Sequence, residues 1–185
     1  MTTSPTTVTL IGAKGGVGTS TVAAMYALTV ARTGQPVRLS AIDSAGVEDL
    51  ATILAVPVPA HGQSVEAGPG LTLADHTAED CTNVIDGDTD RFSDHEGSVY
   101  VVLRNDIQSL RRALDVPRTT VGAILLIEAK RALGARDAAD VLSYPIVAEL
   151  QVDPAIARLV DAGLLATGRN IRVDLGVTAQ PASVR

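Results

Sequence analysis

The residues most able to do chemistry lie in a glycine-rich stretch near the start of the chain, residues 10–21 (LIGAKGGVGTST). A run of apolar residues gives way there to glycines, to one lysine, Lys14, and then to hydroxyl side chains. Glycines let successive backbone N–H groups turn toward one anion, and a helix that starts directly after them adds the positive end of its dipole. The stretch therefore predicts a phosphate-binding loop between a buried strand, which contains Val8, Leu10 and Ile11, and a helix over 19–32.

This stretch matches the phosphate-loop pattern G-x-x-x-x-G-K-[ST] at Gly18 and at Ser20, whose hydroxyl is the magnesium ligand of that pattern, and Gly12 lies one residue before the position of the pattern's first glycine. Thr19 stands where the pattern has its lysine. The alternative interpretation is a tight turn without a ligand. The strand before the loop, the helix after it and the two hydroxyls at the expected places favour the phosphate loop.

The segment from Lys14 to Thr21 has the form K-G-G-x-G-x-[ST]-T and resembles the deviant phosphate loop of the ParA/MinD family of ATPases, with the CpaE/TadZ branch matching about as well. The resemblance extends over residues 7–165. It implies a P-loop NTPase-type α/β fold, binding of ATP and Mg²⁺, and a homodimer around the nucleotide, in which Lys14 reaches the partner's nucleotide. The loop residues implied to bind the nucleotide are Gly15, Gly16, Val17, Gly18, Thr19, Ser20 and Thr21, with Ser20 also on the metal.

Asp43 follows an apolar run, 37–42, that predicts the second strand. In the family a similar turn holds an aspartate that orients the attacking water, and Asp43 matches its second acidic position, while Ala41 stands at the first. An aspartate at the end of a strand also commonly begins the next helix as its N-cap. Both interpretations of Asp43 stay open.

Asp86 ends another apolar run, 82–87, which resembles the family strand whose final aspartate supports magnesium through water. Asp75, after the short apolar segment 71–74, is its rival. The acidic run that begins at Asp86 also starts like a calcium loop, but Arg91 and Gly97 occupy the positions that require glycine and glutamate, so an acidic solvated loop is the better interpretation. The histidines lack the paired spacing of a zinc site.

The length of 185 residues, 46% of them hydrophobic, predicts a single domain over 1–185 with a flexible tail over 168–185. We expect a cytoplasmic location, because the chain lacks an apolar run of about 20 residues and its first residues do not form a basic and then apolar leader. We expect no membrane attachment either, because the tail over 168–185 has no amphipathic pattern with a basic flank. The single cysteine, Cys81, is expected to be a small buried side chain.

The net charge of −6 is unevenly spread, with acidic residues dominating 43–96 and basic residues dominating 104–136. The basic stretch is a candidate for weak, non-specific contact with DNA phosphates. Its arginines could equally solvate helix ends or pair with acidic groups. The residues concerned are Arg111, Arg112, Arg118, Arg131 and Arg136.

Strand-like and helix-like segments alternate along the chain, which predicts a mostly parallel β-sheet with helices on both faces. Further strands are expected at 99–104, 121–127 and 145–151, a loop at 61–70, and helices at 135–142 and from 153 to about 165. A helix before Pro117 should place Ile107, Leu110 and Leu114 on one face.

The resemblance implies an ATP-dependent protein that positions a cargo, such as a plasmid, a chromosome site or a secretion machine, through an unidentified adaptor protein. Two departures bear on this function. Thr19 implies weak hydrolysis, and Glu128 stands where many relatives have an asparagine that reads adenine. The alternative is a pseudo-ATPase scaffold that keeps the fold without turnover.

Overall fold

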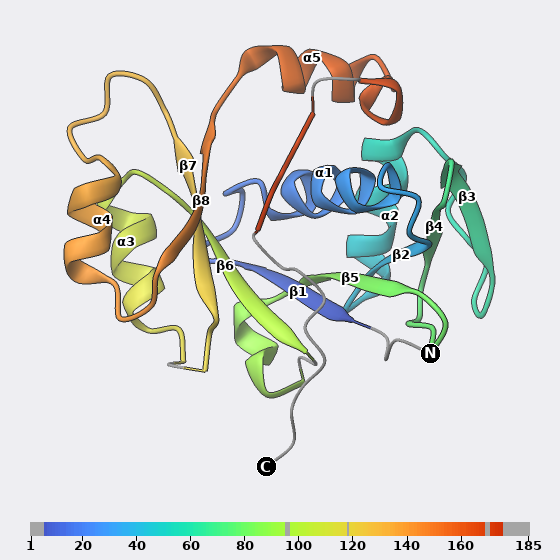
Figure 1. Cartoon of the computed structure of the whole chain (residues 1–185), viewed down its shortest axis with the longest axis horizontal. Helices are drawn as coiled ribbons and strands as arrows, with labels where there is room; N and C mark the ends of the chain where they lie inside the picture. The colour runs from blue at the N-terminus through green and yellow to red at the C-terminus, as the bar shows by residue number, and fades with distance from the viewer. Residues whose placement is uncertain (1–5, 95–96, 118, 169–170, 176–185) are drawn as a thin grey trace.

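One central β-sheet organises the fold in the computed structural model, which describes residues 6–94, 97–117, 119–168 and 171–175. Within these residues eight strands form the sheet in the order β3-β4-β2-β5-β1-β6-β7-β8 (Figure 1). Neighbouring strands are parallel except for β3 and β4. The strands are β1 (Thr7–Gly12), β2 (Val37–Ala41), β3 (Ser64–Gly68), β4 (Leu71–Ala74), β5 (Thr82–Gly87), β6 (Ser98–Arg104), β7 (Gly122–Ile127) and β8 (Ile146–Gln151).

Helices cover both faces of the sheet, as the continuous apolar strands require. One apolar core lies under α1, α2 and α5, and a second lies under α3 and α4. The helical segments are α1 (Thr19–Ala31), α2 (Ser44–Leu54), the 3₁₀ segment η1 (Thr89–Asp94), α3 (Ile107–Leu114), α4 (Ala135–Val141), α5 (Pro154–Asp161) and η2 (Leu165–Thr167). The predicted α/β fold with a mostly parallel sheet is confirmed.

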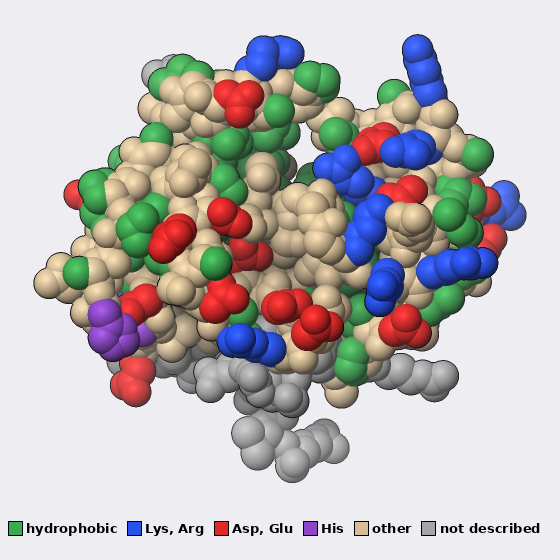
Figure 2. All heavy atoms as spheres, turned by 180° about the vertical axis from the view of Figure 1, so that it is seen from behind, with side chains coloured by type: hydrophobic (Ala, Val, Ile, Leu, Met, Phe, Trp, Pro, Cys, Tyr) green, Lys and Arg blue, Asp and Glu red, His purple; other side chains and the backbone are tan. Residues whose placement is uncertain are grey.

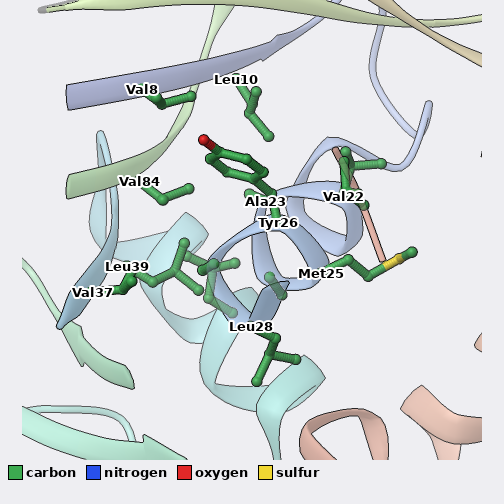
Figure 3. Close-up of a cluster of buried hydrophobic side chains, with 14 of the residues drawn as sticks. Val8, Leu10, Val22, Ala23, Met25, Tyr26, Leu28, Val37, Leu39 and Val84 are labelled. Carbon is green, nitrogen blue, oxygen red and sulfur yellow. The ribbon is translucent and has the colours of Figure 1, made fainter. Parts of the chain in front are cut away.

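Helix α1 fixes the position of the glycine-rich loop because it is buried along most of its length. Its small residues, such as Ala23, allow close approach to the sheet (Figure 3). Tyr26 lies among Val8, Leu10 and Val84 from the two central strands β1 and β5, and burial raises the pKa of its hydroxyl to about 12. The start of α1 is thereby held rigidly against the end of β1.

Two boundaries differ from the sequence expectations. The expected loop at 61–70 contains strand β3, because the turn at Pro69 and Gly70 folds it back antiparallel onto β4 as an edge hairpin. Helix α5 ends at Asp161 rather than near Leu165. Gly163 takes a left-handed conformation with φ of 66°, and the N–H of Leu164 bonds the carbonyl of Leu159 at 2.8 Å, which terminates the helix.

Part of the segment expected to be a flexible tail packs against α1. Ile171, Val173 and Leu175 are buried in the larger core. Arg32, at the end of α1, donates hydrogen bonds to the carbonyls of Ile171 at 3.0 Å and Gly168 at 2.7 Å. Residues 171–175 therefore belong to the folded core.

One expectation of burial is wrong. Cys81 lies directly before β5 and is half-exposed, because the strand begins one residue later. On α3, Ile107, Leu110 and Leu114 lie on one side of the helix as expected and line one cavity with residues of α4. Leu110 is buried there, whereas Ile107 is 59% and Leu114 56% exposed. Among the helices that the structure describes, none has the length and apolar character needed to cross a bilayer.

Candidate functional site

The glycine-rich loop joins the end of β1 to the start of α1 in a conformation that needs its glycines. Gly16 and Gly18 have φ of 72° and 107°, a region that other residues rarely adopt. A Cβ atom on Gly12 would lie 2.5 Å from the Thr19 hydroxyl, whereas one on Gly15 would meet no atom within 4 Å. The loop is therefore closed at its base and open above Gly15.

At the N-terminus of α1, which follows this loop, no side chain of the helix itself occupies the first backbone N–H groups. Gly18 is its N-cap and supplies no side-chain hydrogen bond, and the first turn contains no acidic residue. The first backbone N–H groups of a helix have no intrahelical acceptor. These donors and the helix dipole favour an anion at the opening.

A cavity of about 480 Å³, here called the loop cavity, lies above the loop at the carboxyl ends of the central strands. It brings together Lys14, residues 15–21, Asp43 and Asp86. The loop residues, Asp43 and Asp86, which the sequence analysis proposed for nucleotide, water and metal, thus lie at one site. The rival Asp75 is absent from its lining, so the geometry favours Asp86 over Asp75.

Asp86 is the most deeply buried carboxyl group in the lining of the loop cavity, with 8% of the residue exposed. Burial is the main cause that raises its pKa to about 6, and the carboxylates of Asp49 and Asp43 add to the effect. A hydrogen bond from Ser20 opposes the rise. Asp86 and Ser20 are therefore close enough to act on the same hydrated cation.

Asp43 has both of the geometries that the sequence left open. Its Oδ1 accepts a hydrogen bond from the N–H of Gly46 at 2.8 Å, so it is the N-cap of α2. It also lines the loop cavity. Asp49, one turn further along α2, and Asp88, after β5, line the same cavity and were not foreseen.

Lys14 is held by an aspartate from a distant part of the sequence. Its Nζ lies 3.3 Å from both carboxylate oxygens of Asp106, the N-cap of α3. Burial would raise the pKa of Asp106, but hydrogen bonds from Ser109 and Lys14 outweigh it, so the pKa lies below the usual value. In the described structure Lys14 therefore bonds its own chain.

The segment after β5 is also hydrogen-bonded to the loop. The hydroxyl of Thr89, in η1, donates to the carbonyl of Gly12 at 3.0 Å. Thr89 lines the loop cavity together with Gly87 and Asp88. The start of η1 is thus hydrogen-bonded to the base of the loop.

A second cavity of about 280 Å³ adjoins the loop cavity and is called here the α5 slot. The two share Val17, Gly18 and Thr21 in their linings. The rest of the α5 slot comes mainly from apolar side chains of α1, β7, β8 and α5, together with Arg104 and two aspartates. The lining residues beyond the shared three are Val22, Met25, Arg104, Leu126, Leu150, Gln151, Val152, Asp153, Ile156, Ala157, Val160 and Asp161.

Glu128 does not line the α5 slot but forms ion pairs beside it. Its carboxylate contacts Arg104 on one side and Arg131 on the other, and these guanidinium groups, Arg131 foremost, hold its pKa below the usual value. The amide side chain of Asn105 fixes the backbone of Glu128 by accepting from its N–H at 2.9 Å and donating to its carbonyl at 3.2 Å. The carboxylate of Glu128 is thus paired with two arginine side chains.

The rival aspartate, Asp75, belongs to a separate polar cluster at the end of β4. Its carboxylate accepts hydrogen bonds from His61 at 2.6 Å and His76 at 2.8 Å, and from the N–H of Gly62. The hydrogen bond from His76 is the first of the causes that lower the pKa of Asp75 far below its usual value. The cluster explains the residue as a local structural acceptor.

The proposed basic surface is less uniform than its sequence suggests. Arg111, Arg112 and Arg136 are exposed on α3 and α4, whereas Arg131 pairs with Glu128, and Arg118 lies outside the described residues. Figure 2 shows Lys and Arg side chains gathered on the right-hand half of the face seen from behind, with Asp and Glu among them. Only part of the predicted set is thus free of carboxylate partners of its own.

Within the residues that the structure describes, no three His, Cys, Asp or Glu side chains are placed to hold a metal ion. A magnesium ion at Ser20 and Asp86 would therefore need phosphate oxygens and water for its remaining positions. Mg²⁺ normally binds in this way, with few protein ligands. The donor set fits a metal that arrives with a phosphate.

These features define a P-loop NTPase-type fold, with a cavity of about 480 Å³ at the carboxyl ends of the central strands, where the strand order of the sheet reverses. Neither protein-family models nor curated proteins give a match to the sequence.

Solved structures identify the fold more closely. A ParA family ATPase from Chlorobium tepidum is 17% identical, with a TM-score of 0.70 over 89% of this chain and 91% of that chain. MinD from Pyrococcus horikoshii, solved with Mg-ADP, is 14% identical, with a TM-score of 0.71 over 88% and 87%. MinD in the MinC:MinD cell division complex of Aquifex aeolicus is 16% identical, with a TM-score of 0.69 over 85% and 86%. The fold is that of the ParA/MinD ATPases.

Proposed function

We propose that this protein binds an adenine nucleotide with Mg²⁺ and acts as a ParA/MinD-like positioning protein. The observation that carries the proposal is the pair of adjoining cavities that share Val17, Gly18 and Thr21. The loop cavity offers backbone donors and a helix N-terminus for phosphates, and the α5 slot offers apolar walls for a flat base. A nucleotide spans such a pair of sites. The Mg-ADP bound to MinD of the same fold supports this assignment.

The residues of the loop cavity have separate roles in this proposal. The N–H groups of residues 15–19 cradle the phosphates, and Thr21 contacts phosphate at the shared wall. Ser20 and ionised Asp86 hold the hydrated cation, and Asp43 orients water. Magnesium, when bound, would neutralise phosphate charge.

Slow turnover is expected because the loop cavity is poor in cations. Its described lining contains the carboxylates of Asp43, Asp49, Asp86 and Asp88 but a single Lys or Arg side chain, Lys14. Charge that develops on a transferred phosphoryl group is stabilised mainly by fixed cations and metal. The same observation favours the second candidate function, a nucleotide-bound or empty scaffold without hydrolysis.

We further propose that two copies dimerise around the nucleotide and engage a cargo through an adaptor protein. Lys14 would leave Asp106 and lie between the facing phosphates, which repel one another unless a cation separates them. The MinC:MinD complex shows that a protein of this fold binds a partner protein. Dimer and cargo rest on the resemblance and on the position of Lys14.

Calorimetric titration of MgADP and MgATP into the wild type and Thr19→Lys tests nucleotide binding. A charge-assisted hydrogen bond contributes roughly 1.5–3 kcal/mol, so the added lysine should tighten binding by about 10- to 100-fold. The matched control is Thr33→Lys, which adds the same charge just beyond the opposite end of α1, roughly 20 Å away. Phosphate release measured on the same proteins separates the switch from the scaffold.

The outcomes are distinct. Tight binding by the wild type with no gain in Thr19→Lys would mean that the loop does not need a cation at position 19. Failure of the wild type and Thr19→Lys to bind either nucleotide would refute the proposed function. Binding without phosphate release would favour the scaffold.

A further inference from the structure

A site without its loop lysine must find positive charge elsewhere. Among the described residues that line the loop cavity or the α5 slot, Lys14 and Arg104 are the two Lys or Arg side chains. Lys14 is bonded to Asp106 and lines the loop cavity. Arg104 does not line the loop cavity but reaches the loop from the adjoining α5 slot.

Arg104 contacts the loop itself. It is the last residue of β6, the strand that pairs with β1. Its Nε donates a hydrogen bond to the carbonyl of Val17 at 3.1 Å, and Val17 is only 1% exposed. The guanidinium therefore lies directly behind the peptide that joins Val17 to Gly18.

This contact acts on a backbone donor of the loop. The carbonyl of Val17 and the N–H of Gly18 belong to one peptide group, so a charged donor on the carbonyl polarises the N–H as well. In addition, a guanidinium cannot lose its charge at ordinary pH, and at a partly buried position its field is screened less than in water. Both effects favour an anion at the loop.

Glu128 limits this effect. Its carboxylate forms an ion pair with the same guanidinium, and Asn105 fixes its backbone beside Arg104. A negative charge next to Arg104 reduces the positive potential that the loop receives. The two side chains should therefore act on phosphate binding in opposite directions.

We propose that Arg104 is a positioning residue for the nucleotide phosphates, supplying from behind the loop the positive charge that Thr19 does not provide, and that Glu128 attenuates it. The inference rests on the proposed nucleotide binding. A purely structural tie between β6 and the loop predicts something different. In that case, removal of either partner would loosen the loop and weaken binding.

The test is calorimetric titration of MgADP, and separately of adenosine, into four variants and the wild type. Arg104→Gln should weaken MgADP binding by about tenfold, the lower end expected for one charge-assisted hydrogen bond. Arg104→Lys should restore part of the affinity, because it keeps the charge without the guanidinium fork. Glu128→Gln should tighten MgADP binding several-fold. Arg112→Gln, an exposed change of the same charge on α3, is the matched control and should have no effect.

Two comparisons keep the inference refutable. Adenosine lacks phosphate, so its affinity should be the same in all variants; an equal loss for adenosine and MgADP in Arg104→Gln would assign Arg104 to the base and overturn the proposal. Weaker or unchanged MgADP binding in Glu128→Gln would also overturn it, and this variant leaves the bond from Arg104 to Val17 in place.

The same titrations distinguish a protein that does not bind nucleotide from one in which Arg104 has no role in binding. If neither the wild type nor Glu128→Gln binds MgADP, both the nucleotide site and the role of Arg104 are refuted. If the wild type binds and Arg104→Gln binds equally well, only the role of Arg104 is refuted. Thermal unfolding without nucleotide shows whether each variant is folded before it is titrated.

Discussion

Replacing Asp86 by asparagine should make the protein more stable at neutral pH while impairing its metal site. The pKa of this buried carboxyl is raised from 3.8 to about 6, chiefly by burial. A raised pKa means that folding opposes the ionised form. Above pH 6 the folded protein therefore carries a cost of about 3 kcal/mol, at about 1.4 kcal/mol per pKa unit. Asparagine keeps the shape without the charge.

The expected gain is about 1–3 kcal/mol in the free energy of unfolding at pH 7.5, because the asparagine amide also has to be buried. The pH dependence gives the sharper test. Between pH 3.8 and 6 the folded state binds more protons than the unfolded state, so wild-type stability falls as pH rises through this window. The advantage of Asp86→Asn should shrink to below about 1 kcal/mol at pH 4.

Urea unfolding at several pH values, without nucleotide or metal, measures this difference. Asp75→Asn is the control with the opposite sign, because hydrogen bonds lower the pKa of Asp75 and ionisation there favours folding. Destabilisation of Asp86→Asn at pH 7.5, or a gain that does not change with pH, would refute the reasoning. In the wild type, magnesium-dependent nucleotide binding should weaken below pH 6, since the cation requires the ionised carboxylate.

Two other predictions concern assembly and DNA. In light scattering with a non-hydrolysable ATP analogue, Lys14→Ala should stay monomeric. Asp106→Asn can still cap α3 but no longer holds Lys14 by charge, so it should dimerise at a lower nucleotide concentration than the wild type. A monomer in every sample would contradict nucleotide-dependent dimerisation. Duplex DNA binding should be weak, should fall steeply with salt, and should be lost when Arg111, Arg112 and Arg136 are changed to glutamine; no binding by the wild type at ~50 mM salt would exclude this role.

The sequence predicted the loop well because its signals are local. A buried strand, glycines at positions of positive φ and a helix without an acidic first turn follow one another within residues 7–31. Asp86 could be placed for a similar reason, since it ends an apolar strand next to β1. Edge strand β3 was missed because a short strand with mixed side chains resembles a loop until its partner β4 is known.

The contacts of the site that the sequence did not predict are those that depend on the order of strands in the sheet. Lys14 meets Asp106, and Val17 meets Arg104, only because β6 lies directly beside β1. No local sequence pattern marks Asp106 or Arg104 as a contact of the loop. The general expectation that carboxyl ends of neighbouring parallel strands meet could have drawn attention to the residues after β6.

The residues at the end of β6 and directly after it thus include one cation of the site, Arg104, and the partner of the other, Lys14. Arg104 supports the loop from behind, Asn105 bonds the backbone at Glu128, and Asp106 holds Lys14 in front. If the protein binds nucleotide as proposed, these contacts would set how much positive charge the phosphates meet at the loop. If the acidic members of the network, Asp106 and Glu128, were both neutralised, nucleotide should bind more tightly even though Thr19 is unchanged. Such a result would mean that Lys14 and Arg104 supply positive charge which Asp106 and Glu128 offset, so that the replacement of the loop lysine would not by itself abolish binding.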